Sequence, residues 1–168
     1  MTVTLGPGNN QFALAYMDYD LNLPVTGAFS DFGTIPGTPA AGVTFELDEP
    51  NVSNVFTDFT ANALKNQNNV ATPGGSLCCD VAWALGVGGI DVPNGEQAQI
   101  TFTVGTTQPA SGFWLQQTNV NQIGAIGESI YLSETTTLTK TATPEPASLT
   151  VLSGGLIVLG LLRRRRPG

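Results

Sequence analysis

Alternating polarity is the feature that most constrains the fold of this chain, and it is clearest at residues 96–104, which read EQAQITFTV. Apolar side chains occupy every second position there, and glutamine and threonine occupy the positions between them: the apolar residues are Ala98, Ile100, Phe102 and Val104. A period of two residues indicates a β-strand with one buried face. The Pro-Asn-Gly run at 93–95 suits a turn, because proline presets φ and the next two residues tolerate left-handed backbone.

Short runs of the same kind recur along the chain. We expect further strands at 12–17, 43–47, 52–59, 81–85, 113–118 and 129–141. The strand at 81–85 and the one at 96–104 are expected to be joined by a longish loop. Clusters rich in Gly, Pro and Asn lie between the runs, at 33–42 and 66–75, and residues 60–66 offer one or two helical turns. The pattern predicts an all-β fold, specifically an antiparallel β-sandwich of the jelly-roll or Ig-like kind.

Charge excludes one large class of partner. Before residue 144 the chain carries two lysines and twelve acidic residues, a formal charge of −10. Such a surface repels a phosphate backbone, so we expect no nucleic acid as partner. A strongly negative surface instead favours solubility and attracts divalent cations.

The C-terminus has a different composition from the rest. Sixteen uncharged, largely apolar residues at 147–162 precede four basic residues, Arg163, Arg164, Arg165 and Arg166. As a helix the apolar run is about 24 Å long at about 1.5 Å per residue, slightly less than the hydrocarbon core of a bilayer, and the long arginine side chains extend its effective length. We therefore expect a transmembrane helix at 147–162, with the arginines fixing its orientation on the cytoplasmic side.

A short proline motif, made of Pro144, Glu145 and Pro146, stands directly before this helix. The order of motif, apolar helix and arginine cluster near the chain end resembles the PEP-CTERM sorting signal of Gram-negative bacteria. The resemblance covers about the last 25 residues. It implies an exosortase as partner, cleavage near the motif, and release of the body to the cell exterior, where such proteins are associated with exopolysaccharide, biofilm or floc matrix.

The resemblance also implies a route. We expect a precursor anchored in the inner membrane and then a cell-surface or extracellular protein. The first twelve residues, MTVTLGPGNNQF, lack the basic and apolar regions of a signal peptide, so we expect a leader missing from this chain. The domains expected are a β-sandwich body at 1–134, a Thr-rich strand end and linker at 135–143, and the sorting tail at 144–168.

Catalytic machinery is not visible. The chain has no histidine, which excludes Ser-His-Asp and Cys-His arrangements. A glycosidase-like carboxylate pair stays open, but the spacing of the acidic residues does not indicate one. We expect a non-catalytic cell-surface or matrix protein with no cofactor. The alternatives are a carbohydrate-binding module and, third, an ice-binding-like or adhesive surface protein.

Calcium is the metal that the sequence suggests most. Asp18, Asp20 and Asn22 place oxygen side chains at alternate positions, as at the start of an EF-hand loop. The loop's later glycine and glutamate are missing, so a strand with a polar edge is the competing interpretation. A second acidic group, Glu46, Asp48 and Glu49, is expected to be a solvated strand end.

Three other features leave alternatives open. Trp114 is a possible sugar contact and Trp83 another, although core packing is the competing interpretation for both. Threonine recurs at every second position over 135–143, and this single row is too narrow for an ice-binding plane. Adjacent Cys78 and Cys79 form a reduced pair, a strained vicinal disulfide or a bond to another chain.

Overall fold

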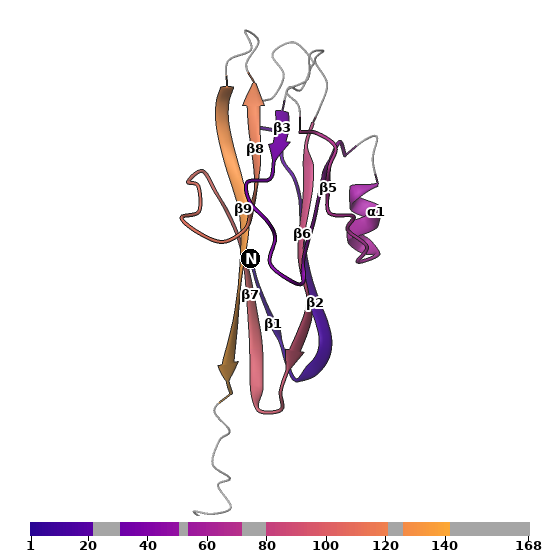
Figure 1. Cartoon of the computed structure of the whole chain (residues 1–168), viewed down its shortest axis with the longest axis vertical. Coiled ribbons are helices and arrows are strands. Elements are labelled where there is room, and N and C mark those ends of the chain that lie inside the picture. Colours follow the sequence, from indigo (N-terminus) through magenta and orange to yellow (C-terminus); the bar gives the residue numbers. More distant parts are fainter. Residues whose placement is uncertain (22–30, 51–53, 72–79, 121–125, 142–168) are drawn as a thin grey trace, which may run out of the picture.

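The computed structural model describes residues 1–21, 31–50, 54–71, 80–120 and 126–141 (Figure 1). Nine strands and one short helix lie in these ranges. They are β1 Thr2–Leu5, β2 Gly8–Asp18, β3 Asp31–Thr34, β4 Val43–Asp48, α1 Val55–Thr60, β5 Gln67–Asn68, β6 Ala82–Val92, β7 Glu96–Gly105, β8 Trp114–Val120 and β9 Ile126–Lys140. The all-β expectation is confirmed.

The strands form two facing sheets (Figure 1). One has the order β1-β7-β9-β8-β3 and the other the order β2-β6-β4-β5. Every pairing is antiparallel except the short parallel contact between β4 and β5. The arrangement is sandwich-like, with one apolar core between the sheets.

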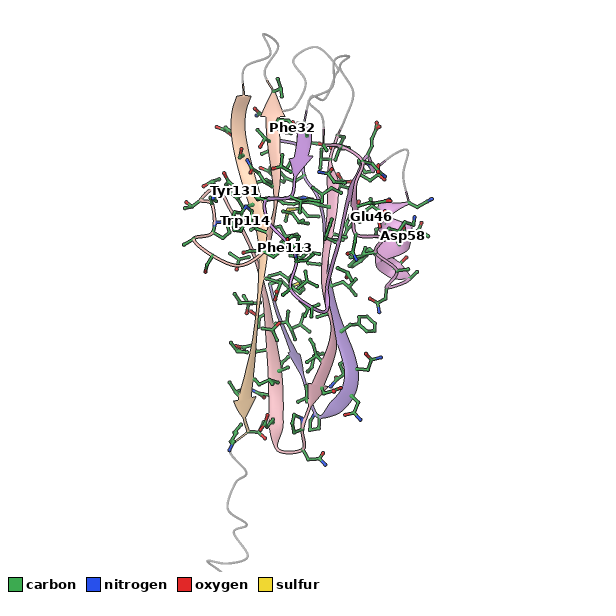
Figure 2. All side chains as sticks on the ribbon, in the orientation of Figure 1. Phe32, Glu46, Asp58, Phe113, Trp114 and Tyr131 are labelled. Carbon is green, nitrogen blue, oxygen red and sulfur yellow. The ribbon has the colours of Figure 1, made fainter. Side chains whose placement is uncertain are left out.

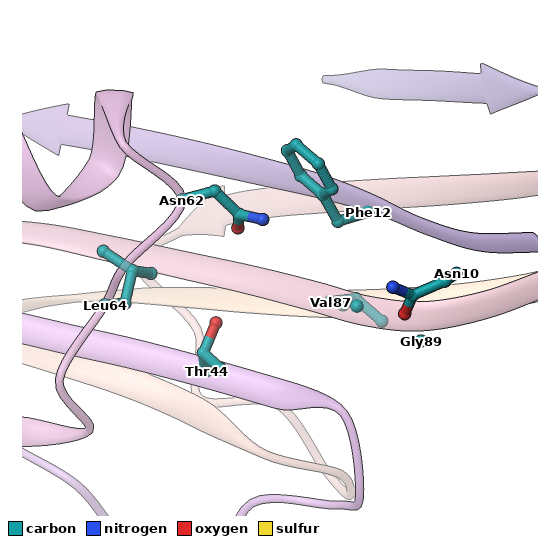
Figure 3. A pocket seen from close by; sticks show the side chains of 8 residues that line it. Asn10, Phe12, Thr44, Asn62, Leu64, Val87 and Gly89 are labelled. Carbon is teal, nitrogen blue, oxygen red and sulfur yellow. The ribbon is translucent and has the colours of Figure 1, made fainter.

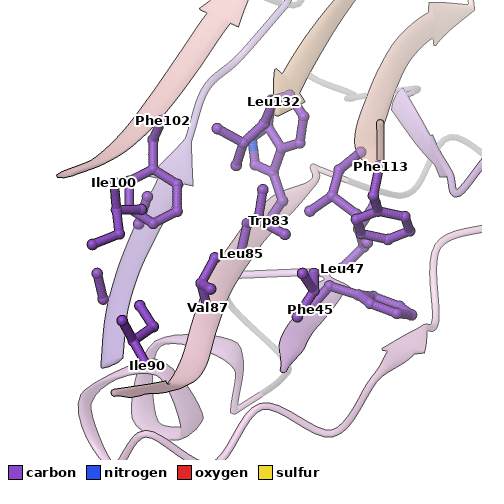
Figure 4. Packing of buried hydrophobic residues seen from close by; sticks show 14 of the residues in the cluster. Phe45, Leu47, Trp83, Leu85, Val87, Ile90, Ile100, Phe102, Phe113 and Leu132 are labelled. Carbon is purple, nitrogen blue, oxygen red and sulfur yellow. The ribbon is translucent and has the colours of Figure 1, made fainter. Parts of the chain in front are cut away.

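Strand β6 is the centre of the core. Trp83 and Leu85 on its inner face are fully buried. Figure 4 shows them between residues of both sheets, including Phe45 and Leu47 of β4 and Leu132 of β9. Ala82 and Ala84 on the outer face are fully buried too, because they lie under Val55 of α1. Burial on both faces explains why this part of β6 is continuously apolar.

Two expected elements differ from the structure. The sequence predicts a strand at 52–59, but the described part of that run, 54–59, forms the N-cap and most of α1. Val55 and Phe59, four residues apart, lie on one side of that helix and pack with Tyr16 and the alanines of β6. The expected longish loop after residue 85 is also wrong: β6 continues to Val92, and a tight turn with Gly95 at φ 81° leads into β7.

The last strand extends through the Thr-rich stretch. β9 reaches Lys140, which pairs with Glu96 of β7, so the boundary expected at 134 falls inside a strand. Within the described residues no helix is long and apolar enough to cross a membrane. The expected transmembrane segment at 147–162, like the whole sorting tail, lies outside those residues.

Candidate functional site

Three aspartates converge where the ladder between β2 and β6 ends. The last Cα partners of that ladder are Asp18 and Ala82. The same antiparallel register, carried two residues further, sets Asp20 opposite Asp80. One carboxylate oxygen from each of the three aspartates lies within 4.8 Å of the other two. We call this group, Asp18, Asp20 and Asp80, the aspartate cluster.

The three carboxylates differ in burial. Asp18 and Asp20 are exposed, whereas Asp80 is only 8% exposed. Burial, with the nearby charges of Asp18 and Asp20, raises the pKa of Asp80 to about 6. Partial desolvation and the Asp20 charge raise the pKa of Asp18, and burial followed by the Asp18 charge raises the pKa of the Tyr16 hydroxyl that hydrogen-bonds Asp18. The cluster thus concentrates negative charge around one buried carboxyl group, that of Asp80.

The charge of the cluster is not balanced by protein groups in the described part of the chain. The ion pair found there joins Lys65 to Asp58 at 2.6 Å, away from the cluster. Within the same residues, the Asp80 Oδ1 atom is buried and has no hydrogen-bond partner. The Asp80 carboxyl also lies within hydrogen-bonding reach of the Asp20 carboxyl. Because ionised carboxylates only accept hydrogen bonds, a shared proton or a bound cation would stabilise this approach of the two carboxyl groups.

A second acidic group on the same sheet, Glu46 and Asp48, differs from the aspartate cluster because protein donors satisfy its carboxylates. Glu46 is fully buried, and its two oxygens accept hydrogen bonds from the Lys65 backbone N–H at 3.1 Å and Gln67 Nε2 at 2.9 Å. Asp48 accepts from Asn69 Nδ2 at 2.6 Å and from the backbone N–H of Glu49 at 2.8 Å. The expectation of a solvated strand end is therefore wrong for Glu46, whose carboxylate fastens the 65–67 segment to β4.

A buried polar pair lies near the cluster. Gln117 of β8 donates through Nε2 to Asp31 Oδ2 at 2.8 Å and to the Tyr19 backbone carbonyl at 2.7 Å. Tyr19 is the residue between Asp18 and Asp20, so this contact ties the segment after β2 to the opposite sheet. Burial raises the pKa of Asp31 as well.

The structure bears on two of the three residues in the sequence-based calcium prediction. The structure brings Asp18 and Asp20 together, and Asn22 lies outside the described residues. Asp80 was missed because it is 60 positions further along the chain and joins the cluster only through strand pairing. The local signal was weak, since a single aspartate before an apolar strand is common.

A separate pocket of about 310 Å³ opens beside β2, β4 and β6. Figure 3 shows the amides of Asn10 and Asn62, the Thr44 hydroxyl and the Phe12 ring around one opening. Phe12 is 50% exposed. Asn10 and Asn62 both have left-handed backbone, with φ of 51° and 52°, a conformation that asparagine tolerates better than most residues. An exposed ring beside amides and a hydroxyl offers both stacking and hydrogen bonding.

The two tryptophans have different environments. Trp83 is a core residue, fully buried. Trp114 is partly exposed and pairs with Ser133 on the outer face of the five-stranded sheet, where Figure 2 shows it near Tyr131. The neighbouring Phe113 instead turns inward and contacts Phe45, with ring centroids 5.4 Å apart.

The alternating threonines of β9 form part of a wider polar face. Thr135 and Thr137 pair with Thr101 and Gln99 of β7. Thr101 in turn pairs with Thr2 of β1, and the two hydroxyl oxygens are 3.2 Å apart. The polar face therefore spans three strands and is wider than the row of threonines on β9 alone.

The comparisons with known proteins add nothing to this geometry: no family model, no curated protein and no solved structure matches the chain. The residues of the expected sorting signal, Pro144 to Pro146 and the four arginines, lie outside the described residues.

Proposed function

We propose that this chain is a non-catalytic cell-surface or extracellular-matrix protein, delivered by an exosortase through its C-terminal sorting signal. The finer fold that goes with this proposal is a β-sandwich body of the jelly-roll or Ig-like kind followed by a transmembrane helix at 147–162. The proposed precursor is anchored in the inner membrane, and the released body associates with exopolysaccharide.

One observation carries the proposal. Every described strand precedes the proline motif: β9 ends at Lys140, and the Thr141 backbone N–H donates to the Gly95 carbonyl at 2.9 Å. Pro144 follows three residues later. Cleavage near that motif would therefore leave both sheets intact on the released piece, as a sorting signal appended to a self-contained body requires.

Loss of the motif is expected to stop release. The full chain, with a leader supplied, is expressed in a host that has an exosortase and in one that lacks it. We expect a body truncated near Pro144 outside the cell only in the first host, and at least about tenfold less of it for Glu145→Ala, because this change removes the acidic residue of the recognition motif. Intact mass and cell fractionation measure both.

Glu128→Ala, which removes an exposed glutamate of β9, is the matched control and should be released normally. An uncleaved chain in both hosts would contradict the proposed sorting.

A second function, carbohydrate binding, is favoured by the pocket at Phe12. Its volume is at the lower end of the range for small-ligand sites, and its ring and amides match the apolar faces and hydroxyls of a sugar. This observation moves the proposed sugar contact from Trp114, whose ring is only partly exposed, to Phe12. An ice-binding-like or adhesive role for the threonine face is a third and weaker proposal.

Polysaccharide affinity separates the two aromatic candidates. Phe12→Ala is expected to weaken binding of a soluble exopolysaccharide by about fivefold, since a lost stacking contact is worth about 1 kcal/mol. Phe56→Ala is the control, because Phe56 is similarly exposed, at 57%, but does not line the pocket. Titration calorimetry compares them with Trp114→Ala, and a loss confined to Trp114→Ala would exclude the Phe12 pocket.

A further inference from the structure

We propose that the aspartate cluster is a calcium site that joins the end of β2 to the segment leading into β6. The proposal does not rest on the sorting route or on carbohydrate binding. It starts from the geometry already described: three carboxylates from two segments meet at the last ladder pair, Asp18 and Ala82, and just past it, where the ladder between β2 and β6 ends.

The first support is the fit of the oxygens to the ion. Calcium takes oxygen ligands at about 2.3 to 2.6 Å, so two ligands on opposite sides of one ion are about 4.6 to 5.2 Å apart. The three carboxylate oxygens lie within 4.8 Å of one another. One ion can therefore contact all three with little rearrangement.

The second support is Asp80 itself. Its side chain is more than nine-tenths buried, at 8% exposure, and its Oδ1 atom has no partner among the described residues. A buried carboxylate oxygen without a partner is costly. The Val81 backbone N–H donates to this carboxylate, and its other neighbours are the acidic side chains of the cluster and the hydroxyl of Tyr16. A divalent cation supplies the missing positive charge and the missing contact at once.

The third support is the comparison with Glu46 and Asp48. Both belong to the same sheet, and their carboxylates are satisfied by protein donors. An acidic side chain that only stabilises this fold thus has donors built around it. In the described part of the chain the aspartate cluster has the Tyr16 hydroxyl as a donor to Asp18 and the Val81 backbone N–H as a donor to Asp80, but the buried Asp80 Oδ1 atom has no donor.

The composition of the site sets its expected strength. Three carboxylates supply fewer than the six to eight oxygens that calcium takes, so water completes the shell. Such sites resemble those of extracellular modules, with dissociation constants of about 0.1 to 1 mM. Calcium at millimolar concentration would then occupy the cluster and hold the end of β2 against the segment that leads into β6.

Thermal unfolding of the full chain tests the site. After treatment with a chelator and dialysis, about 10 mM CaCl₂ is expected to raise the Tm of the wild type by about 3 to 10 °C, relative to NaCl at equal ionic strength. The NaCl reference removes the general screening of a negatively charged protein. Asp80→Asn and Asp20→Asn are expected to abolish the calcium-specific rise.

Asp91→Asn is the matched control. Asp91 is exposed and accepts a hydrogen bond from the Asn10 backbone N–H at 2.8 Å, which an asparagine oxygen still accepts. The Asp91→Asn variant loses one negative charge, as the cluster variants do, and should keep the full calcium-dependent rise in Tm. Since Asp20 is exposed, its variant provides a test even if the Asp80 variant folds poorly.

Three results would overturn the proposal. These are no calcium response beyond that of NaCl in the wild type, an equal response in Asp80→Asn and Asp20→Asn, or an equal response to MgCl₂. The last would exclude selectivity for calcium, because magnesium demands a smaller octahedral shell that it prefers to fill with water.

Discussion

Replacing Trp83 with alanine is expected to lower the free energy of unfolding by about 3 to 5 kcal/mol, the range for truncating a large aromatic residue in a core. Trp83 is fully buried between the two sheets. It belongs to β6, the strand paired with both β2 and β4, so the cavity would lie at the centre of the sandwich. Urea unfolding of the full chain measures the change.

Trp83→Phe separates packing from hydrogen bonding. The Trp83 Nε1 atom is buried with no partner among the described residues, so phenylalanine removes an unpaired N–H and leaves most of the ring volume. We expect a loss of less than about 1.5 kcal/mol. Trp114→Ala is the control for loss of an indole from a partly exposed site and should cost less than half as much as Trp83→Ala. Equal losses for the two alanine variants would contradict the assigned core.

The strands could be predicted where alternation is long and one-sided. This holds for β7 and for the segments inside β2, β4, β8 and β9, since each has one face on the core. β3 could not be, because it is a four-residue strand, DFGT, with a buried aspartate and a glycine. Its Gly33 packs so closely against Leu47 and Val70 that a Cβ there would clash. Tertiary packing, not a local pattern, places that strand.

The helix and the site were harder to predict for the same reason. The sequence of α1 resembles that of a strand. Only Val55 of this helix is fully buried, so the residues show no helical pattern of buried positions that the sequence alone could reveal. The aspartate cluster needs the register of β2 against β6, which two separated stretches of sequence do not reveal. The alternate spacing of Asp18 and Asp20 indicates a candidate site, whereas Asp80 has no such acidic neighbour before its strand.

Stability without metal is expected to fall as the pH rises, the reverse of the usual behaviour of ion-paired carboxylates. Among the described acidic residues, burial raises the pKa of Asp31, Glu46 and Glu134, and burial with neighbouring charge raises that of Asp80 to about 6. A raised pKa means that the folded state binds more protons than the unfolded state in this range. The stabilisation is therefore complete below the ordinary carboxyl pKa and is lost as the pH rises through the folded pKa.

Asp80 sets the size of the effect. With its pKa moved from 3.8 to about 6, linkage predicts a loss of about 2 kcal/mol between about pH 4.5 and about pH 7.5 from this group alone. The groups that face it are Asp18, Asp20 and the Tyr16 hydroxyl, none of which supplies positive charge. Urea unfolding at the two pH values, with a chelator present, measures the loss.

Asp80→Asn is expected to remove most of this pH dependence and to stabilise the metal-free protein at about pH 7.5, because a neutral amide replaces a buried charge and can donate to a neighbouring aspartate. Asp91→Asn should leave the pH dependence unchanged. With calcium present the wild type is expected to be more stable than Asp80→Asn, since the wild type binds the ion and the variant does not. A wild type that becomes more stable from about pH 4.5 to about pH 7.5 in chelator would show that the buried carboxylates are paired with cations after all.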